Sequence, residues 1–517
     1  MIVLVGFMGA GKTTVGRLAA EKLDLPFADA DTLIQARAQM TVPEIFEARG
    51  EEGFRELERA VVADLLDGPE AVVALGGGAV LDERTRKDLA WANVVHVDVS
   101  LPTALERARD GSERPMLSQR DPESLYEERV PLYREVADFT VSTDHRSPEE
   151  VAFEVAQIIT GPRRVRVTTP GRSYDVVIGP GASAAAGAAA AQDTDKAFLV
   201  TEDDLLDLST GVVEELERAG LQVIALVVPA GEEAKSLATA ERLYARLAEA
   251  PAHRADMVVA FGGGAVTDVA GFVASTFVRG MRLVNVPTTL LGQVDAAIGG
   301  KNAVNLPHAK NQVGTIYQPH LVCCDVGLLE SLPEVELRSG LAEVVKYGLI
   351  SDPSLLDFLT SRAGRILERD PATLSELVAR CVRIKAAIVS RDELDHSERA
   401  RLNYGHTFAH AIESCLGFGA IRHGEAVALG MMAAAHLARA LGLVDDEVVA
   451  THRRALEAAG LPTRADLDLA ALEEAWLRDK KYARGVRFVL LRGLGRAEWG
   501  FEAPRAALRE AIERMSE

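Results

Sequence analysis

The chain has 517 residues, and at about 150 residues per domain this length suggests roughly three domains. Hydrophobic residues make up 48% and charged residues 26%, proportions that argue against a disordered or fibrous protein. Acidic residues (77) outnumber Lys plus Arg (57), and the net charge of −20 argues against nucleic acid or an anionic membrane as the main partner. Small anionic substrates remain compatible with this charge, because a single pocket can be locally basic.

The cysteines and the apolar runs indicate the compartment. Cys323, Cys324, Cys381 and Cys415 show no Cys-x-x-Cys spacing, so we expect buried thiols of a reducing compartment rather than disulfides. No apolar run approaches the roughly 20 residues of a membrane span, and the first residues lack the basic region of a signal peptide. We therefore expect a cytoplasmic protein that binds neither nucleic acid nor a membrane.

Patterns along the chain predict three units. A Gly-Pro pair at 161–162 follows a helical pattern and precedes strand-like alternation, so we place a boundary there. Apolar strands then alternate with helical stretches, which predicts a parallel α/β sheet. Beyond about residue 330 the strand signal fades and helical periodicity takes over. The predicted units are residues 1–162, 163–330 and 331–517.

The first unit opens with a phosphate-binding motif. Residues 6–13 read GFMGAGKT, which fits G-x-x-x-x-G-K-[ST], and they lie between a strand-like run and a helical run, the context that this motif requires. Its glycines allow backbone N–H groups to surround a phosphate, Lys12 can reach the β- and γ-phosphates, and the Thr13 hydroxyl can bind Mg²⁺. The motif therefore predicts nucleotide binding rather than a plain Gly-rich turn.

Charged residues further along this unit indicate a binding site for the molecule that accepts the phosphoryl group. Asp29 and Asp31 are two residues apart, and we expect them on the same face of a strand end, where one could serve the metal and the other a substrate hydroxyl. A solvated acidic loop is the alternative. Further motifs are GFRELE with Arg55, GGG at 76–78, ERPML with Arg114 and ERVPLYRE with Arg129. Taken together, residues 1–160 resemble shikimate kinase.

The resemblance implies two adjoining sites. Arg55 and Arg129 would hold the carboxylate of shikimate, and Asp31 would bind ring hydroxyls and draw a proton from the attacking one. Arg107 would face the adenine, with Arg109 as a rival, and Arg114 would belong to a lid. The implied shikimate site is Asp31, Arg55, Gly76, Gly77, Gly78 and Arg129. The implied ATP and Mg²⁺ site is Gly9, Gly11, Lys12, Thr13, Thr14, Asp29, Arg107 and Arg114, of which Lys12 and Arg114 would be catalytic together with Asp31.

The second unit carries a glycine triplet after a predicted strand. AFGGGAVTDVAGF (260–272) by itself is equally compatible with a tight turn between a strand and a helix. PAGEEAKS (229–236) and VPTTLLGQVDAAIGGKNAVNL (286–306) add a more specific pattern, and residues 165–517 resemble 3-dehydroquinate synthase, which holds NAD as a catalytic cofactor. The resemblance implies an NAD site at Asp203, Glu232, Lys235, Gly263, Gly264, Asp268, Thr288 and Thr289.

Histidines of the third unit indicate a metal site. NYGHTFAHAIE (403–413) places His406 and His410 one helical turn apart, and the lack of the Glu of H-E-x-x-H disfavours a zinc protease. The resemblance implies that Glu343, His406 and His423 bind zinc, or cobalt, and that His410 transfers a proton. Three protein ligands would leave room for substrate oxygens, as in catalytic zinc sites. A site with His410 as a fourth ligand stays an alternative.

The same resemblance implies a cationic substrate site, suited to a phosphorylated sugar acid. Its members would be Arg279, Asp295, Lys301, Lys310, Asn311, Lys346, Lys385, Asp395, Arg399, Asn403, Lys480 and Lys481. Lys301 and Lys346 would be catalytic together with His410. The family usually has Glu where this chain has Asp395. Arg279 would reach the site of a neighbouring subunit, which implies a homodimer formed through the synthase part.

The expected fold is α/β: a P-loop kinase domain with a parallel sheet, a Rossmann-like nucleotide-binding domain, and a mostly helical metal-binding domain. The resemblances imply a bifunctional enzyme of chorismate and aromatic amino acid biosynthesis. It would phosphorylate shikimate with MgATP and convert 3-deoxy-D-arabino-heptulosonate 7-phosphate to 3-dehydroquinate and phosphate. Alternatives are another sugar-phosphate cyclase, a related metal-dependent alcohol dehydrogenase, and a nucleotide-binding scaffold without catalysis.

Overall fold

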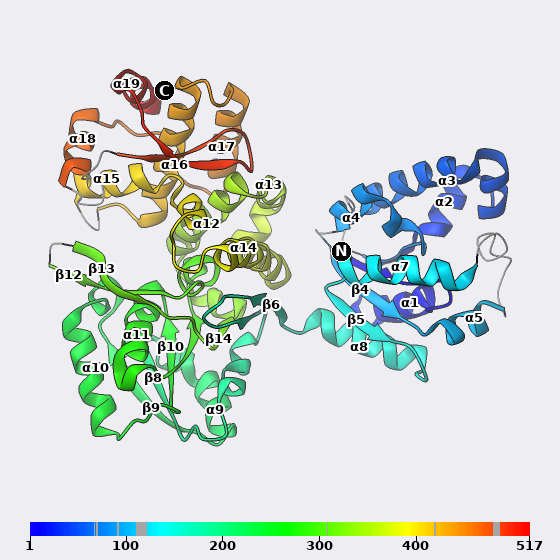
Figure 1. Cartoon of the computed structure of the whole chain (residues 1–517), viewed down its shortest axis with the longest axis horizontal. Helices are drawn as coiled ribbons and strands as arrows, with labels where there is room; N and C mark the ends of the chain where they lie inside the picture. The colour runs from blue at the N-terminus through cyan, green and yellow to red at the C-terminus, as the bar shows by residue number, and fades with distance from the viewer. Residues whose placement is uncertain are drawn as a thin grey trace. The chain divides into compact units, whose positions relative to one another are not determined.

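The computed structural model describes residues 1–517 except 67, 69–70, 90–91, 110–120, 308, 418–419, 479–485 and 517. The chain divides into two compact units, Met1–Gly161 and Pro162–Glu517 (Figure 1). Among the described residues, no helix combines the length and the apolar character needed to cross a membrane.

The first unit is a parallel sheet with helices around it. The strand order is β2-β3-β1-β4-β5, and every pair is parallel. All four residues of β1 are buried, as expected for a parallel strand covered on both faces. The strands are β1 Ile2–Val5, β2 Phe27–Asp29, β3 Val72–Ala74, β4 Asn93–Asp98 and β5 Phe139–Ser142. The helices are α1 Lys12–Leu23, α2 Ala30–Ala38, α3 Val42–Leu66, α4 Glu83–Leu89, α5 Leu101–Arg109, α7 Pro122–Val136 and α8 Pro148–Thr160.

Helix capping decides where Asp29 and Asp31 lie. Asp29 ends β2, and its carboxylate accepts a hydrogen bond from the Thr32 backbone N–H at 3.1 Å, so it caps α2. The helix therefore begins directly after the strand, and Asp31 lies in its first turn. The prediction that the two carboxylates share one face of a strand end is wrong for this reason.

The second unit contains a seven-stranded sheet, in the order β6-β7-β14-β11-β10-β8-β9. The strands are β6 Arg163–Val167, β7 Tyr174–Ile178, β8 Lys196–Glu202, β9 Gln222–Val228, β10 Met257–Gly262, β11 Arg282–Pro287 and β14 Leu321–Cys324. Six strands run parallel, but β6 pairs antiparallel with β7 at the edge. A short connection allows only a hairpin between two strands, so the predicted parallel sheet has an antiparallel edge.

Helices and a second hairpin accompany this sheet. The helices are α9 Thr210–Arg218, α10 Leu237–Glu249 and α11 Gly264–Thr276. Strands β12 Lys301–Leu306 and β13 Ala309–Ile316 form a separate antiparallel pair that contacts α11. Figure 1 shows this hairpin above α10 and α11. The sequence patterns did not predict it, because its residues lie inside a motif that we interpreted only for ligand binding.

The rest of the second unit is mostly helical. Its helices are α12 Glu334–Ile350, α13 Ser354–Leu367, α14 Pro371–Arg391, α15 His406–Leu416, α16 His423–Ala440, α17 Asp446–Ala458, α18 Leu469–Arg478 and α19 Arg505–Glu513. A hairpin of β15 Phe488–Leu491 and β16 Ala497–Phe501 interrupts them. One hydrophobic core includes Val176 and Val322 of the sheet as well as Leu341 and Met431 of the helices, so sheet and helices pack as one body.

The cysteines are buried, with one exception. Cys323 and Cys324 in β14 and Cys381 in α14 are buried. Cys415 is exposed, because the last turn of α15 leaves the core. The expectation of a buried thiol is therefore wrong at Cys415.

Candidate active sites

The phosphate loop joins β1 to α1, which begins at Lys12. Gly9 and Gly11 have φ angles of 81° and 87°, in the left-handed region that favours glycine. A Cβ at Gly9 would lie 2.4 Å from the Ala104 carbonyl oxygen, so the close approach also requires glycine. Lys12 Nζ donates to the Gly6 carbonyl at 2.8 Å. A loop of this shape at a helix N-terminus fits a bound phosphate.

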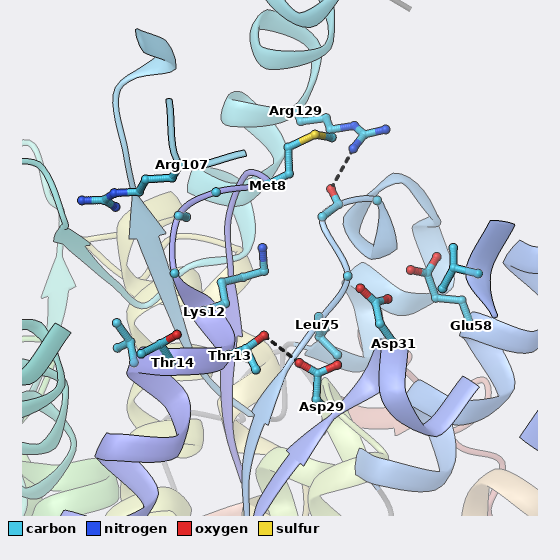
Figure 2. A pocket seen from close by; sticks show the side chains of 18 of the residues that line it. Met8, Lys12, Thr13, Thr14, Asp29, Asp31, Glu58, Leu75, Arg107 and Arg129 are labelled. Atoms are coloured by element: carbon cyan, nitrogen blue, oxygen red, sulfur yellow. Dashed lines mark hydrogen bonds between the residues drawn. The ribbon is translucent and has the colours of Figure 1, made fainter. Parts of the chain in front are cut away.

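A carboxylate lies beside the loop at the place predicted for Mg²⁺. Thr13 Oγ1 donates to Asp29 Oδ2 at 2.7 Å, and Figure 2 shows Thr13 directed at Asp29. A hydroxyl and a carboxylate are the hard oxygen ligands that Mg²⁺ prefers, so this pair fits the ion.

One cavity of about 980 Å³ contains the kinase residues that the sequence predicts and the structure describes. These lining residues are Gly9, Gly11, Lys12, Thr13, Thr14, Asp29, Asp31, Arg55, Gly76, Gly77, Gly78, Arg107 and Arg129. Arg114 lies outside the described residues, and so does the side chain of Arg109. A donor nucleotide and an acceptor can therefore share one cavity.

A buried arginine lies at the end of the cavity where the phosphoryl acceptor is expected to bind, which we call the acceptor end. Arg129, in α7, is 2% exposed, and its Nη1 donates to the Gly77 carbonyl at 3.4 Å. Tyr133, one turn later, donates to the same carbonyl and holds the 76–78 turn against α7. Among the described residues, Nε and Nη2 of Arg129 have no hydrogen-bond partner. Buried, unpaired guanidinium nitrogens fit an anionic ligand such as a carboxylate.

Glu58 also lines the acceptor end, although sequence reasoning missed it. Glu58 is 3% exposed, and its carboxylate accepts a hydrogen bond from Arg55 Nη1 at 2.6 Å. Burial raises the pKa of Glu58 against the lowering effect of Arg55. The three-residue spacing of Arg55 and Glu58 on one helix was the signal that could have found this pair.

The opposite end of the cavity contains Arg107 (Figure 2). Its guanidinium donates to the Thr143 hydroxyl at 3.0 Å and to the Thr143 carbonyl at 2.9 Å. Thr143, Arg146 and Pro148 line the same end and were not predicted. They follow β5, where no motif in the sequence marks them.

In the second unit, the ends of two neighbouring strands bring the predicted NAD residues together. Strands β10 and β11 are parallel neighbours, so the turns that follow them meet at the same edge. Gly263 is the N-cap of α11, and Gly264 is its first residue. The Thr288 N–H donates to the Gly262 carbonyl at 3.0 Å, which ties the two turns together. A glycine turn at a helix N-terminus fits the pyrophosphate of a dinucleotide.

The loop 229–236 adds charged groups to this edge. Lys235 is buried and forms an ion pair with Asp268 of α11. Burial raises the pKa of Asp268 to about 6, and Lys235 opposes the rise. Asp203 is exposed, and the neighbouring Glu202 contacts the loop instead, accepting a hydrogen bond from the Gly231 N–H at 3.1 Å.

Glu343, His406 and His423 form a cluster that fits a metal ion. Each offers one ligand atom, and these atoms lie within 4.8 Å of one another. Glu343 lies within α12, whereas the two histidines are the first residues of α15 and α16. His410 lies one turn beyond His406, with 5.7 Å between the ring centroids, and it is not part of this cluster.

Glycines on α16 allow the three helices to approach. A Cβ at Gly424 would lie 2.2 Å from the Ser339 carbonyl of α12. A Cβ at Gly430 would lie 2.2 Å from the Gly405 carbonyl, at the start of α15. Because both contacts leave no room for a side chain, they fix the ends of α15 and α16 near Glu343.

Hydrogen bonds orient both imidazoles toward the centre of the cluster. His406 Nδ1 lies 3.1 Å from the Tyr404 carbonyl, and His423 Nδ1 lies 3.2 Å from Glu413 Oε1. If each Nδ1 carries the proton, each Nε2 is left to bind a metal, the arrangement common at zinc sites. Two imidazoles and a carboxylate are a typical ligand set for zinc, so these residues fit the ion. Glu413 was missed, although it ends the NYGHTFAHAIE motif.

Next to this cluster, buried cations pair with carboxylates. Lys346 forms an ion pair with Glu343, and Lys385 Nζ lies 2.7 Å from Asp295 Oδ1. The lysines Lys385 and Lys346 hold the pKa of Asp295 well below its usual range although burial opposes its charge. Burial lowers the pKa of Lys385 to about 8, a shift that Asp295 only partly offsets.

Other predicted substrate residues lie around these pairs. Lys301 Nζ lies 2.5 Å from Asp395 Oδ2, so the shorter acid reaches this lysine. Arg399 is buried and donates to the carbonyls of Gly299 and Glu393 at 3.0 and 2.9 Å. Lys310 and Asn311 lie in β13, and Asn403 ends a short 3₁₀ helix before α15. Arg279 is exposed, and Lys480 and Lys481 lie outside the described residues.

Comparisons with known proteins match three stretches of the chain to family models. Residues 8–160 match the family model for shikimate kinase. Residues 225–339 match the model for the 3-dehydroquinate synthase N-terminal part, and residues 340–482 match the model for its C-terminal part. The chain is 44% identical over 307 residues to the 3-dehydroquinate synthase of Desulforamulus reducens, an alignment that covers 59% of this chain and 86% of the relative.

Two solved structures resemble the second unit. A 2-deoxy-scyllo-inosose synthase in complex with carbaglucose-6-phosphate, NAD⁺ and Co²⁺ is 27% identical with a TM-score of 0.63, covering 68% of this chain and 100% of that chain. A 2-epi-5-epi-valiolone synthase from Streptomyces hygroscopicus subsp. jinggangensis 5008 with NAD⁺ and Zn²⁺ bound is 27% identical with a TM-score of 0.60, covering 66% and 97%. Identity is thus far higher to the dehydroquinate synthase than to these cyclases. The chain belongs to the 3-dehydroquinate synthase family, and it carries a shikimate kinase domain ahead of its synthase part.

Proposed function

We propose a role for each site residue of this bifunctional enzyme in its two reactions. The kinase domain transfers a phosphoryl group from MgATP to shikimate. The synthase part converts 3-deoxy-D-arabino-heptulosonate 7-phosphate to 3-dehydroquinate and phosphate, with NAD⁺ and a zinc or cobalt ion. The kinase assignment is supported by the shared cavity. The synthase assignment is supported by the cluster of Glu343, His406 and His423.

In the kinase cavity, the loop amides and Lys12 hold the β- and γ-phosphates, while Thr13 and Asp29 hold Mg²⁺. Arg55 and Arg129 bind the shikimate carboxylate through their planar guanidinium groups. Asp31 orients the attacking hydroxyl and accepts its proton. Phosphoryl transfer depends on in-line positioning and on cations around the transferred group, which these side chains provide. Arg107 contacts the nucleotide base, and Arg114 contributes its charge to phosphoryl transfer.

In the synthase part, Glu343, His406 and His423 hold the metal, and the turns after β10 and β11 with Glu232, Lys235 and Asp268 hold NAD⁺. When bound, NAD⁺ accepts and returns a hydride, and the metal polarises the reacting oxygen. Lys301, Lys346, Lys385 and Arg399 bind the phosphate and the carboxylate of the substrate, together with the other predicted substrate residues. Asp295 orients Lys385. His410 moves a proton at the substrate.

We also propose that the synthase part forms a homodimer in which Arg279 reaches the neighbouring subunit's site. Val278 and Arg279 have φ angles of 43° and 62°, a left-handed conformation that is strained for a β-branched residue. Both side chains are exposed. Strain of this kind persists where the surrounding structure imposes it, and it is common at functional sites. The Arg279 side chain has no hydrogen bond or ion pair with the described part of its own chain, which supports a role toward a second copy.

The proposed domains are residues 1–162, 163–330 and 331–517, and the proposed compartment is the cytoplasm. The free cysteines, three of them buried, support a reducing compartment.

The deciding experiment measures both reactions on the full chain. We expect ADP formation that depends on shikimate, and phosphate release from the heptulosonate phosphate that depends on NAD⁺ and metal. Glucose 6-phosphate serves as the competing substrate, because a sugar-phosphate cyclase of the 2-deoxy-scyllo-inosose synthase type shares this fold. Release of phosphate from glucose 6-phosphate and not from the heptulosonate would overturn the synthase assignment.

A further inference from the structure

The hairpin of β12 and β13 carries proposed substrate residues and meets the loop 229–236 that we assign to NAD⁺. Lys301 begins β12, whereas Lys310 and Asn311 lie near the start of β13. Asn305, which has no role in the reaction as described so far, lies where hairpin and loop touch. Its backbone N–H donates to the Lys235 carbonyl at 2.8 Å, and its backbone pairs with Ser236.

An irregularity in β13 lies opposite Asn305. Val304 pairs with Val313 and Leu306 pairs with Ala309, and the register shifts between these two pairs. Between these pairs β12 has only Asn305, whereas β13 has Lys310, Asn311 and Gln312. Asn305 therefore has no regular ladder partner, and it contacts both the loop and Asn311 of the opposite strand. Bulges of this kind often occur beside active sites, where they redirect a side chain.

The side-chain amide of Asn305 joins one residue of each ligand site. Its Nδ2 donates to Glu232 Oε2 at 3.3 Å, and its Oδ1 accepts from the Asn311 N–H at 3.1 Å. Because one end of the amide is only a donor and the other only an acceptor, a rotation by half a turn would break both bonds. The position of Glu232 therefore determines the orientation of Asn305 and, through it, the anchoring of Asn311.

Asn311 needs this anchor. Its φ angle is 58°, a left-handed conformation that residues other than glycine adopt infrequently, and it is exposed. The hydrogen bond from its N–H to Asn305 holds the backbone at the point where its side chain would contact the substrate. Without that bond, ordering Asn311 would cost part of the free energy of substrate binding.

We propose that Asn305 is a positioning residue that couples NAD⁺ binding to substrate binding. This inference rests on the proposed roles of Glu232 and Asn311. A cofactor that fixes Glu232 also fixes Asn305 and thereby orders the substrate hairpin. Because such coupling is reciprocal, occupation of the substrate site raises the affinity for NAD⁺ by the same factor.

Titration calorimetry of NAD⁺ into the metal-loaded full chain tests this coupling, with and without saturating inorganic phosphate as the substrate-site probe. In the unaltered protein we expect phosphate to lower the Kd of NAD⁺ by about 5-fold or more. In Asn305→Ala and Asn305→Asp, NAD⁺ still binds but the phosphate effect falls below about 2-fold. Gln312→Ala, an exposed change on the same strand β13, should keep the full effect.

The results separate this inference from the proposed function. A phosphate effect that persists in both Asn305 variants, or that is absent from the unaltered protein, overturns the coupling role. Complete loss of NAD⁺ binding in Asn305→Ala also overturns it, because Asn305 would then be part of the NAD⁺ site itself. If the unaltered, metal-loaded protein binds no NAD⁺ at all, the proposed function has failed instead.

Discussion

Lys385 Nζ lies 2.7 Å from Asp295 Oδ1, next to the proposed substrate site, and Lys385 is 4% exposed. A second bond joins the same ammonium to the Asp295 carbonyl at 2.5 Å. Tyr347 donates to the same Asp295 Oδ1 at 2.7 Å. The carboxylate is thus held by two neighbours, and it holds the lysine in one place. The pKa of Lys385 near 8 makes this pair sensitive to pH in the alkaline range.

The synthase reaction should lose affinity for its substrate as the pH rises above about 8. Below that pH Lys385 carries the charge that attracts the anionic substrate, and above it the charge is lost. We expect the KM for the heptulosonate phosphate to rise between pH 7 and 9.5. Lys385→Arg retains its charge over this range, so its KM should change less with pH even if its activity is lower. Equal pH dependence in both proteins would contradict this role.

Lys385 should make folding stability increase with pH, whereas it makes substrate affinity decrease. The pKa of Lys385 is about 8 in the folded chain and 10.5 in its ordinary state, so between these values the unfolded chain binds the extra proton. The free energy of unfolding therefore rises with pH over this window. Denaturant unfolding at pH 8 and pH 10 should show a smaller gain for Lys385→Met than for the unaltered protein. An equal gain would mean that other groups govern this window.

Lys12→Ala should abolish the kinase and spare the synthase. Lys12 lies in the phosphate loop of the kinase cavity, and loss of one charge stabiliser of this kind costs on the order of 3 kcal/mol or about 100-fold in rate. Shikimate-dependent ADP formation and phosphate release from the heptulosonate are measured on the same preparation. Lys22→Ala, an exposed change on the same helix, should leave both rates unchanged. A folded Lys12→Ala protein that loses both activities would show that the sites depend on each other.

The two units should function when separated. Among the described residues, the buried members of the first unit's core lie between Ile2 and Val155, within the proposed fragment. Residues 1–162 alone should phosphorylate shikimate, and residues 163–517 alone should release phosphate from the heptulosonate. Each fragment is assayed beside the full chain at equal concentration. If neither fragment folds while the full chain is active, the proposed boundary is wrong.

Local motifs predicted the strand-loop-helix of residues 2–23 and the helical turn of His406 and His410, because short sequence patterns determine such structures. Most other candidate site residues came from the two family resemblances. The motifs did not predict Asp31 in a helix, since a capping bond of Asp29 decides that position. They also missed Glu58, Glu413 and Asn305. Each of these residues acts on a predicted one through a contact that arises only in the folded chain.

The metal cluster is another site that its sequence motif predicts only in part. The motif around His406 indicates a metal site, but nothing in it shows that α12 and α16 reach this histidine. Gly424 and Gly430, which lie outside the motif, allow that proximity through their close contacts. A single sequence gives no sign that these two glycines are required.

Glu413→Gln should weaken metal binding without removing a ligand. Glu413 accepts a hydrogen bond from His423 Nδ1 and so leaves Nε2 for the proposed metal. Loss of such a partner typically costs about 10–100-fold in metal affinity. Competition with a fluorescent chelator measures the Kd for zinc directly. Glu330→Gln, an exposed change outside the site, should keep the original Kd. An unchanged Kd in Glu413→Gln would show that Glu413 does not orient His423.

His406→Ala and His410→Ala should fail in different ways, although both residues lie on one face of α15. His406 Nε2 lies 3.5 Å from Glu343 Oε1 within the metal cluster, whereas His410 lies outside that cluster. His406→Ala should lose most of its zinc, because Glu343 and His423 alone chelate weakly. His410→Ala should retain zinc and NAD⁺ but release phosphate more slowly, since general acid–base catalysis is worth about 10²–10⁴-fold. Zinc per chain, by metal analysis of both purified variants, is compared with turnover. If His410→Ala loses zinc as fully as His406→Ala, His410 is a fourth ligand and the four-ligand alternative is correct.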